Sequence, residues 1–199
     1  MCEFSDSKRQ RKSNLYVLAS GLTNNCLQIP LVGCVLQPAS YLVKMNPEAG
    51  AIIFQQTLPA TATAMTVDPA GNIYLTIGNV IEKLTVDGSQ VLYKKTIGGS
   101  TLTFLAVTLD SSGRLYLAGN VGEGDLPATA GSFRPAAPSG NGPFVFAMRL
   151  NSSGSLDYPT YLGNAVQNPY GIAVDEYRER AERETTHRWA WPAASMGNS

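Results

Sequence analysis

A short motif of two strands around a tight turn limits the fold of this chain more than any other feature. In residues 104–118, Val107 and Leu109 alternate with other side chains, which indicates a strand with one buried side. Asp110 and Gly113 follow as turn residues, because a carboxylate accepts nearby backbone N–H groups and glycine takes the positive φ that closes the turn. A second β-rich run completes the motif.

The chain repeats this motif. Residues 65–75 carry it with Asp68 and Gly71 at the turn, residues 171–175 begin another copy, and residues 15–19 retain only its second strand. The repetition predicts an all-β fold assembled from similar units.

A second unit of strand, glycine-closed turn and strand alternates with the first. Its three copies span residues 43–54, 81–93 and 147–158, and Gly88 and Gly154 close the turns of the last two. Together the two units make four antiparallel strands in roughly 40 residues, the pattern typical of β-propeller blades.

The units divide the chain into a polar leader, a repeat region and a charged tail. We expect the leader over 1–13, blades over 14–58, 64–99 and 104–163, an extra strand over 171–175, and the tail over 176–199. The strands expected inside the blades are 14–19, 41–46, 51–58, 64–68, 72–77, 80–86, 90–97, 105–110, 114–120, 144–151 and 156–162. About three blades are too few to close a ring, so an incomplete or open propeller is expected, and its free faces and edges favour self-association.

Two long loops, 20–40 and 121–143, resemble each other and are the expected contact surfaces. In both loops two prolines stand eight residues apart, and an apolar residue precedes the second proline by two positions. Insertions that map to one site of a repeat commonly form a binding face. The candidate contact residues are Pro30, Leu36, Asp125, Pro127 and Phe133.

Composition excludes several classes of function. The net charge is zero and the repeat region holds no basic cluster, which disfavours nucleic acid as a partner. No run of 18 apolar residues exists, so no membrane span is expected. Residues 31–34 resemble a lipoprotein cleavage box, but the stretch before them is too polar for a signal sequence, and we interpret it as loop. Cys26 and Cys34 share that loop and could bridge in an oxidising compartment, although free thiols are expected.

Catalytic, cofactor-binding and metal-ligating patterns are not apparent. His187 is the sole histidine and lies in the tail, which excludes a histidine-based catalytic or metal site in the blades. Asp68, Asp110 and Asp175 recur at one place, and turn formation explains them better than a ring of carboxylates or a Ca²⁺ site. The two carboxylates of residues 122–125 are interpreted as part of a solvated loop rather than as a glycosidase pair.

The combined motifs resemble the bacterial β-propeller repeat family known as SBBP. The likeness covers about residues 14–175 and is fullest in the third repeat, through Val107, Asp110, Gly113, Tyr116, Leu117, Asp125, Leu126, Pro127, Gly131, Phe133, the run 144–151, Gly154, Tyr158, Thr160, Tyr161, Leu162 and Gly163. A looser likeness is to NHL-repeat propellers, through residues 67–74. The SBBP resemblance implies a secreted or cell-surface bacterial protein and brings no catalytic residues.

The pattern stops after Asp175, where the family would continue with a glycine and a second strand. Residues 176–184 are highly charged instead, with i,i+4 pairs of opposite charge that favour a short exposed helix. We interpret the tail from about residue 176 as foreign to the propeller, as a frameshift or a truncated gene model would produce.

The expected function is therefore a non-catalytic binding or scaffold module, with a protein or carbohydrate as partner and no cofactor. Two alternatives stay open. One is a fragment of a carbohydrate-active or lyase propeller whose catalytic residues lie in other blades, and the other is a truncated product without function.

Overall fold

The protein is all-β. The computed structural model describes residues 13–25, 35–48, 50–58, 60–127, 129, 132–163 and 168–175. These residues form eleven strands in three antiparallel sheets, and no helix occurs among them. Within the same ranges, accordingly, no helix could span a membrane. The tail for which we predicted a short helix lies outside the described residues.

The first sheet has three strands and differs from the expected layout. It consists of β1 (Leu15–Asn25), β2 (Val35–Met45) and β3 (Ile52–Leu58), in the order β1-β2-β3. The prediction of a loop over 20–40 was wrong at both ends, because β1 and β2 stay paired from Leu15 and Met45 out to Asn25 and Val35. Cross-strand hydrogen bonds extend this hairpin through residues whose own sequence is too polar to predict a strand.

The second and third sheets each have four strands in sequence order. The second comprises β4 (Ala64–Val67), β5 (Ile73–Ile77), β6 (Val80–Leu84) and β7 (Val91–Thr96). The third comprises β8 (Thr103–Leu109), β9 (Leu115–Val121), β10 (Phe144–Leu150) and β11 (Leu156–Gly163). The predicted blade type, an all-β stack of antiparallel sheets, is confirmed for these segments.

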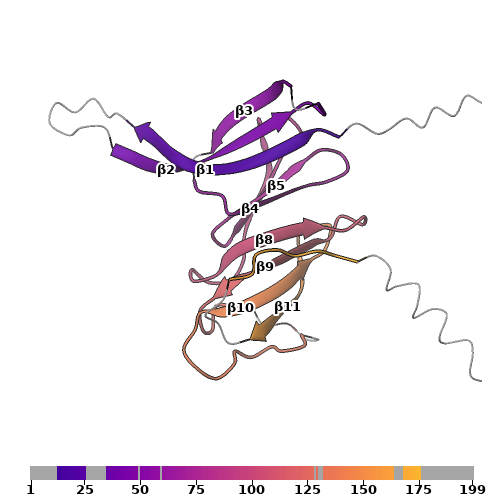
Figure 1. Ribbon diagram of the computed structural model, residues 1–199. Coiled ribbons are helices and arrows are strands. Elements are labelled where there is room, and N and C mark those ends of the chain that lie inside the picture. Colours follow the sequence, from indigo (N-terminus) through magenta and orange to yellow (C-terminus); the bar gives the residue numbers. More distant parts are fainter. Residues whose placement is uncertain are drawn as a thin grey trace, which may run out of the picture.

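The three sheets follow one another in an open stack (Figure 1). The first sheet occupies one end and the third sheet the other, and β8 of the third sheet contacts β4 and β5 of the second. Residues 168–175 join no ladder, so the extra strand expected at 171–175 is not formed. The segment is held to the third sheet by a hydrogen bond in which Asn120 of β9 donates to Asn168, but no described strand pairs with it.

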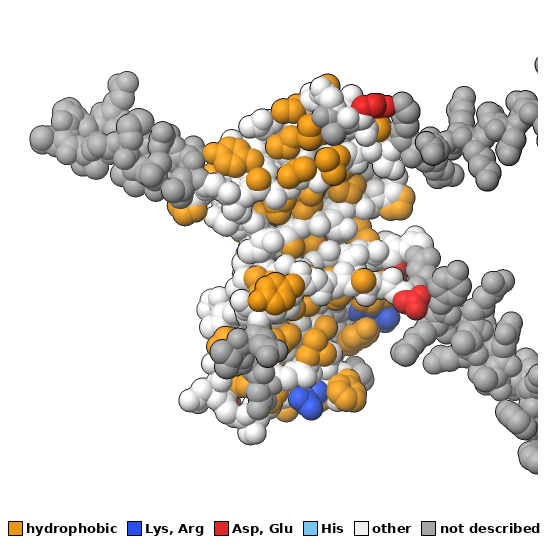
Figure 2. All heavy atoms as spheres, in the orientation of Figure 1, with side chains coloured by type: hydrophobic (Ala, Val, Ile, Leu, Met, Phe, Trp, Pro, Cys, Tyr) orange, Lys and Arg blue, Asp and Glu red, His pale blue; other side chains and the backbone are white. Residues whose placement is uncertain are grey.

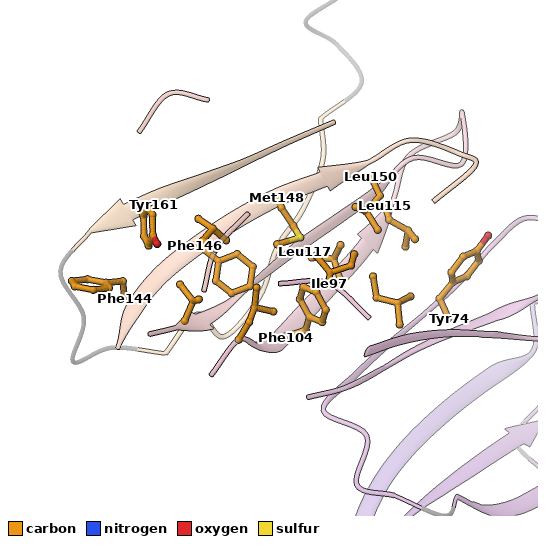
Figure 3. Packing of buried hydrophobic residues seen from close by; sticks show 14 residues of the cluster. Tyr74, Ile97, Phe104, Leu115, Leu117, Phe144, Phe146, Met148, Leu150 and Tyr161 are labelled. Carbon is orange, nitrogen blue, oxygen red and sulfur yellow. The ribbon is translucent and has the colours of Figure 1, made fainter. Parts of the chain in front are cut away.

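Alternating side chains place one apolar core on each side of the second sheet. Ile73 and Leu75 of β5 pack into a cluster with the first sheet, together with Leu42, Leu58, Ala62 and Leu84. The intervening Tyr74 belongs to the other cluster, which joins the second and third sheets. Phe104, Phe144, Phe146 and Met148 are almost fully buried in that second cluster (Figure 3).

The outward face of the first sheet keeps apolar side chains in contact with solvent. Leu15, Val17, Ile52 and Ile53 are between 38% and 56% exposed. Figure 2 shows hydrophobic surface gathered over this end of the molecule. The corresponding side chains of the second sheet are covered because the first sheet packs on them, so the exposure at this end follows from the stack being open.

Candidate functional site

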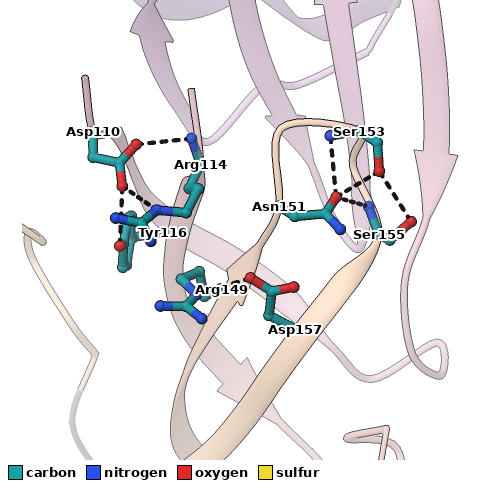
Figure 4. Close-up of polar contacts among 8 residues, drawn as sticks. All are labelled: Asp110, Arg114, Tyr116, Arg149, Asn151, Ser153, Ser155 and Asp157. Atoms are coloured by element: carbon teal, nitrogen blue, oxygen red, sulfur yellow. Dashed lines mark hydrogen bonds and ion pairs between the residues drawn. The ribbon is translucent and has the colours of Figure 1, made fainter. Parts of the chain in front are cut away.

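The turn between β8 and β9 is built around the carboxylate of Asp110 (Figure 4). The Asp110 carboxylate accepts hydrogen bonds from the backbone N–H groups of Ser112 and Arg114, each at 2.9 Å. It also accepts from Arg114 Nε at 2.5 Å and from the Tyr116 hydroxyl at 3.2 Å. Gly113 has φ of 76° and donates its N–H to the Asp110 carbonyl, which closes the turn. Both oxygens of the carboxylate are thus engaged in holding the turn.

Asp68 has the same role between β4 and β5. Its carboxylate accepts the Asn72 N–H and the Asn72 side-chain amide, each at 2.8 Å, while Gly71 has φ of 90°. A Cβ on Gly71 would lie 2.7 Å from the side chain of Val86, which belongs to the turn between β6 and β7, so the close approach of that turn also favours glycine at position 71. Lys83 Nζ lies 3.3 Å from the Asp68 carboxylate. The two aspartates therefore share geometry as well as sequence position.

Electrostatics keeps both aspartates ionised. Burial alone raises the pKa of Asp110, but the hydrogen bonds from Arg114 and Tyr116 outweigh it and leave that pKa below its ordinary value. For Asp68, burial is likewise outweighed by the donors of Asn72 and Lys83, and its pKa is lowered too. A general acid or base works best with a pKa near the working pH. These carboxylates instead behave as permanent acceptors for the turn.

The hairpins of the second unit carry the remaining predicted turn glycines. Gly88 and Gly154 have φ of 72° and 78°. In the β10–β11 turn, the Asn151 side-chain oxygen accepts the N–H groups of Ser153 at 3.1 Å and Ser155 at 2.9 Å. An asparagine oxygen here takes the place that the Asp110 carboxylate has in the first unit.

A tyrosine paired with a cation across two strands recurs in all three sheets, and the sequence interpretation missed it. Tyr16 lies opposite Lys44, Tyr74 opposite Lys83, and Tyr116 opposite Arg149. The Lys44 ammonium is 5.0 Å from the centre of the Tyr16 ring, and the Lys83 ammonium is 4.8 Å from that of Tyr74, which are cation–π distances.

The third pair is built somewhat differently. The Arg149 guanidinium lies 4.8 Å from the centre of the Tyr158 ring and donates to Asp157 at 2.9 Å. A sequence signal for all three pairs existed, since the cation stands two residues before the polar residue that opens the turn: Lys44 before Asn46, Lys83 before Thr85, and Arg149 before Asn151.

The first part of the 121–143 loop is hydrogen-bonded to the connection between β7 and β8. At its start, Asp125 accepts the Thr101 N–H at 2.9 Å, and its own carbonyl accepts the Gly99 N–H at 3.0 Å. Hydrogen bonds from the Thr101 hydroxyl and N–H lower the pKa of Asp125. Leu126 is buried in the core, and Pro127 follows it, half-buried. Asp125, a predicted contact residue, therefore anchors the start of the loop.

The far side of the same loop presents Phe133 to solvent. Its neighbour Arg134 donates its N–H to the Thr160 hydroxyl at 3.0 Å and accepts the Tyr161 N–H at 3.0 Å. Phe133 itself is 88% exposed. Of the predicted contact residues whose side chains are described, Asp125, Pro127 and Phe133, it is the most exposed.

The other candidates are dispersed. Leu36 lies in β2, in a part that was predicted to be loop. Pro30, Cys26, Cys34 and His187 lie outside the described residues. No group of three or more histidine, cysteine or acidic side chains that could hold a metal ion is found in the described ranges.

Comparisons with known proteins add no function. No family model matches the chain, and a search of curated proteins finds no similar sequence. Among solved structures, the chain is similar to a protein of unknown function from Bacteroides caccae, with 13% sequence identity and a TM-score of 0.39. That match covers 62% of this chain and 45% of the other one.

Proposed function

We propose that this protein is a non-catalytic binding or scaffold module of a bacterial SBBP-type repeat protein, acting in a secreted or cell-surface setting. The observation that carries the proposal is Phe133, which is 88% exposed beside Arg134, a residue whose backbone N–H and carbonyl are both hydrogen-bonded to β11. An exposed aromatic side chain next to a hydrogen-bonded backbone segment is a frequent anchor in interfaces.

The polar clusters support a structural role for the rest of the chain. The carboxylates of Asp68, Asp110 and Asp125 all accept hydrogen bonds from their own turn or loop base, and the pKa of each is lowered. Groups used in this way are occupied acceptors rather than acid–base catalysts. Self-association through the open ends of the stack belongs to the same proposal, because the outward face of the first sheet exposes Leu15 and Val17.

A glycan array and a panel of purified cell-surface proteins, followed by a hydrolysis screen on any ligand found, test the binding role. We expect binding that Phe133→Ala weakens by tenfold or more and that Val91→Ala leaves unchanged, because Val91 is 54% exposed on β7 and outside the loop. Both variants should melt at the wild-type temperature.

Two results would contradict the proposal. Binding that is insensitive to Phe133→Ala would remove the loop from the contact surface. Turnover of a bound glycan that depends on residues of these sheets would make the protein an enzyme.

A further inference from the structure

The first sheet has an open strand position beside β1. In the other two sheets, β4 and β8 occupy the place next to β5 and β9. β1 corresponds to β5 because Tyr16 lies opposite Lys44 as Tyr74 lies opposite Lys83. Within the described ranges only β2 is hydrogen-bonded to β1. The other edge of β1 therefore presents backbone N–H and C=O groups to which an extended segment can pair.

A buried cation lies next to this position. Lys44 is 7% exposed, and its ammonium donates to the Val86 carbonyl at 3.1 Å while lying over the Tyr16 ring. Its counterpart Lys83 has the Asp68 carboxylate at 3.3 Å. No carboxylate of the described residues forms an ion pair with Lys44. Burying a cation is costly unless a counter-charge accompanies it, so the site favours an incoming carboxylate.

The missing carboxylate has a defined source in the other sheets. Asp68 and Asp110 immediately follow the strands β4 and β8, which fill the corresponding position. In both strands the aspartate is preceded by an apolar residue, a threonine and a second apolar residue, as in residues 65–68 and 107–110. Residues 171–175 have a similar pattern, because Ile172 and Val174 are half-buried and alternate with exposed residues up to Asp175.

We propose that residues 171–175 of a second copy of this chain add to β1 as an antiparallel fourth strand. By analogy with Val67 opposite Ile73 in the second sheet, Val174 would lie opposite Leu15. Asp175 would then reach the ammonium of Lys44 and the hydroxyl of Tyr16, as Asp68 reaches Lys83 and Asp110 reaches Tyr116. This inference deepens, and rests on, the self-association proposed above.

The position of the segment favours a second copy over the same chain. Residues 168–175 lie on the third sheet, where Asn120 Nδ2 donates to Asn168 Oδ1, whereas β1 belongs to the sheet at the opposite end of the stack (Figure 1). Asp175 already has an interaction within its own chain, which the addition to β1 would replace.

Sedimentation velocity of the full chain over a concentration series tests the proposal. We expect reversible association that Asp175→Asn and Lys44→Met each weaken by about tenfold to a hundredfold, since each change removes a charged hydrogen bond. Val174→Pro should abolish it, because proline cannot continue a strand ladder. Glu82→Gln is the matched control and should leave association unchanged, since Glu82 forms its ion pair with Lys94, between β6 and β7, and not with Lys44.

The possible outcomes distinguish strand addition to β1 from self-association through another surface. A chain that stays monomeric at every concentration would refute both. Association that Asp175→Asn and Val174→Pro leave unchanged would refute strand addition and point to contact through another face. Circular dichroism of each variant verifies that its sheets are formed. Asp175→Asn and Val174→Pro fall in a segment outside every sheet, so a loss of association in these two variants would not reflect unfolding.

Discussion

Removing the Asp110 carboxylate should cost much more stability than replacing it with an amide. The side chain of Asp110 is 3% exposed and accepts two backbone N–H groups, the Arg114 guanidinium and the Tyr116 hydroxyl. A neutral hydrogen bond contributes about 1 kcal/mol net and one to a charged group about 1.5–3 kcal/mol. Because the exposed Ser112 N–H can return to water, we expect Asp110→Ala to lower the free energy of unfolding by about 3 kcal/mol.

Asp110→Asn should be much milder, since the protein already contains a turn of this kind built on asparagine. The Asn151 oxygen accepts the N–H groups two and four residues ahead, at 3.1 and 2.9 Å, as Asp110 does at 2.9 Å each. The amide oxygen keeps both backbone hydrogen bonds of the turn, while its NH₂ group replaces the oxygen that accepts from Arg114 and Tyr116. The Arg114 side chain is 32% exposed and can turn to water. We expect a loss of about 1 kcal/mol, in line with other partly exposed ion pairs.

Urea denaturation followed by far-ultraviolet circular dichroism measures both variants against the wild type, with equal m-values as evidence that the same unfolding is compared. A loss below about 1 kcal/mol for Asp110→Ala would refute the view that this carboxylate holds the turn. Equal losses for the two variants would show that the charge, rather than the backbone hydrogen bonds, carries the stability.

Three further predictions concern packing and pH. Phe104→Ala should cost about 3–5 kcal/mol in a urea titration because Phe104 is fully buried between two sheets, whereas Phe133→Ala should stay within about 0.5 kcal/mol. Gly119→Ala should lower the free energy of unfolding by about 2 kcal/mol or more, since a Cβ there would lie 1.9 Å from a backbone oxygen of β8. Gly163→Ala is the control, because a Cβ at Gly163 meets nothing within 4 Å; an equal loss of stability in the two variants would contradict the argument. Folding lowers the pKa of Asp110, so its contribution to stability is present above the unfolded pKa of about 4 and is lost as the pH falls through the folded value. Asp110→Asn should therefore reduce the loss of stability at acid pH. An unchanged pH dependence of stability in this variant would contradict the role given to the Asp110 carboxylate.

The strands and turns could be predicted because their causes are local. Alternation of apolar side chains, followed by aspartate and a glycine three residues later, specifies a strand and the turn that ends it within a few residues of sequence. This pattern predicts β4 and β8 of the second and third sheets directly, and β5 and β9 as the β-rich runs that follow their turns. The same local reasoning identified Asp110 as a turn residue, and its hydrogen bonds lie within six residues of it.

What only the tertiary structure decided depends on pairing between distant segments. The β1–β2 ladder continues to Asn25 and Val35 because each strand supplies the other with hydrogen bonds, which polar residues accept as readily as apolar ones. Lys44 meets Tyr16 only through the register of that ladder. Conversely, residues 171–175 have the sequence of a strand but form none within this chain, because a strand needs a neighbouring edge as well as a suitable pattern.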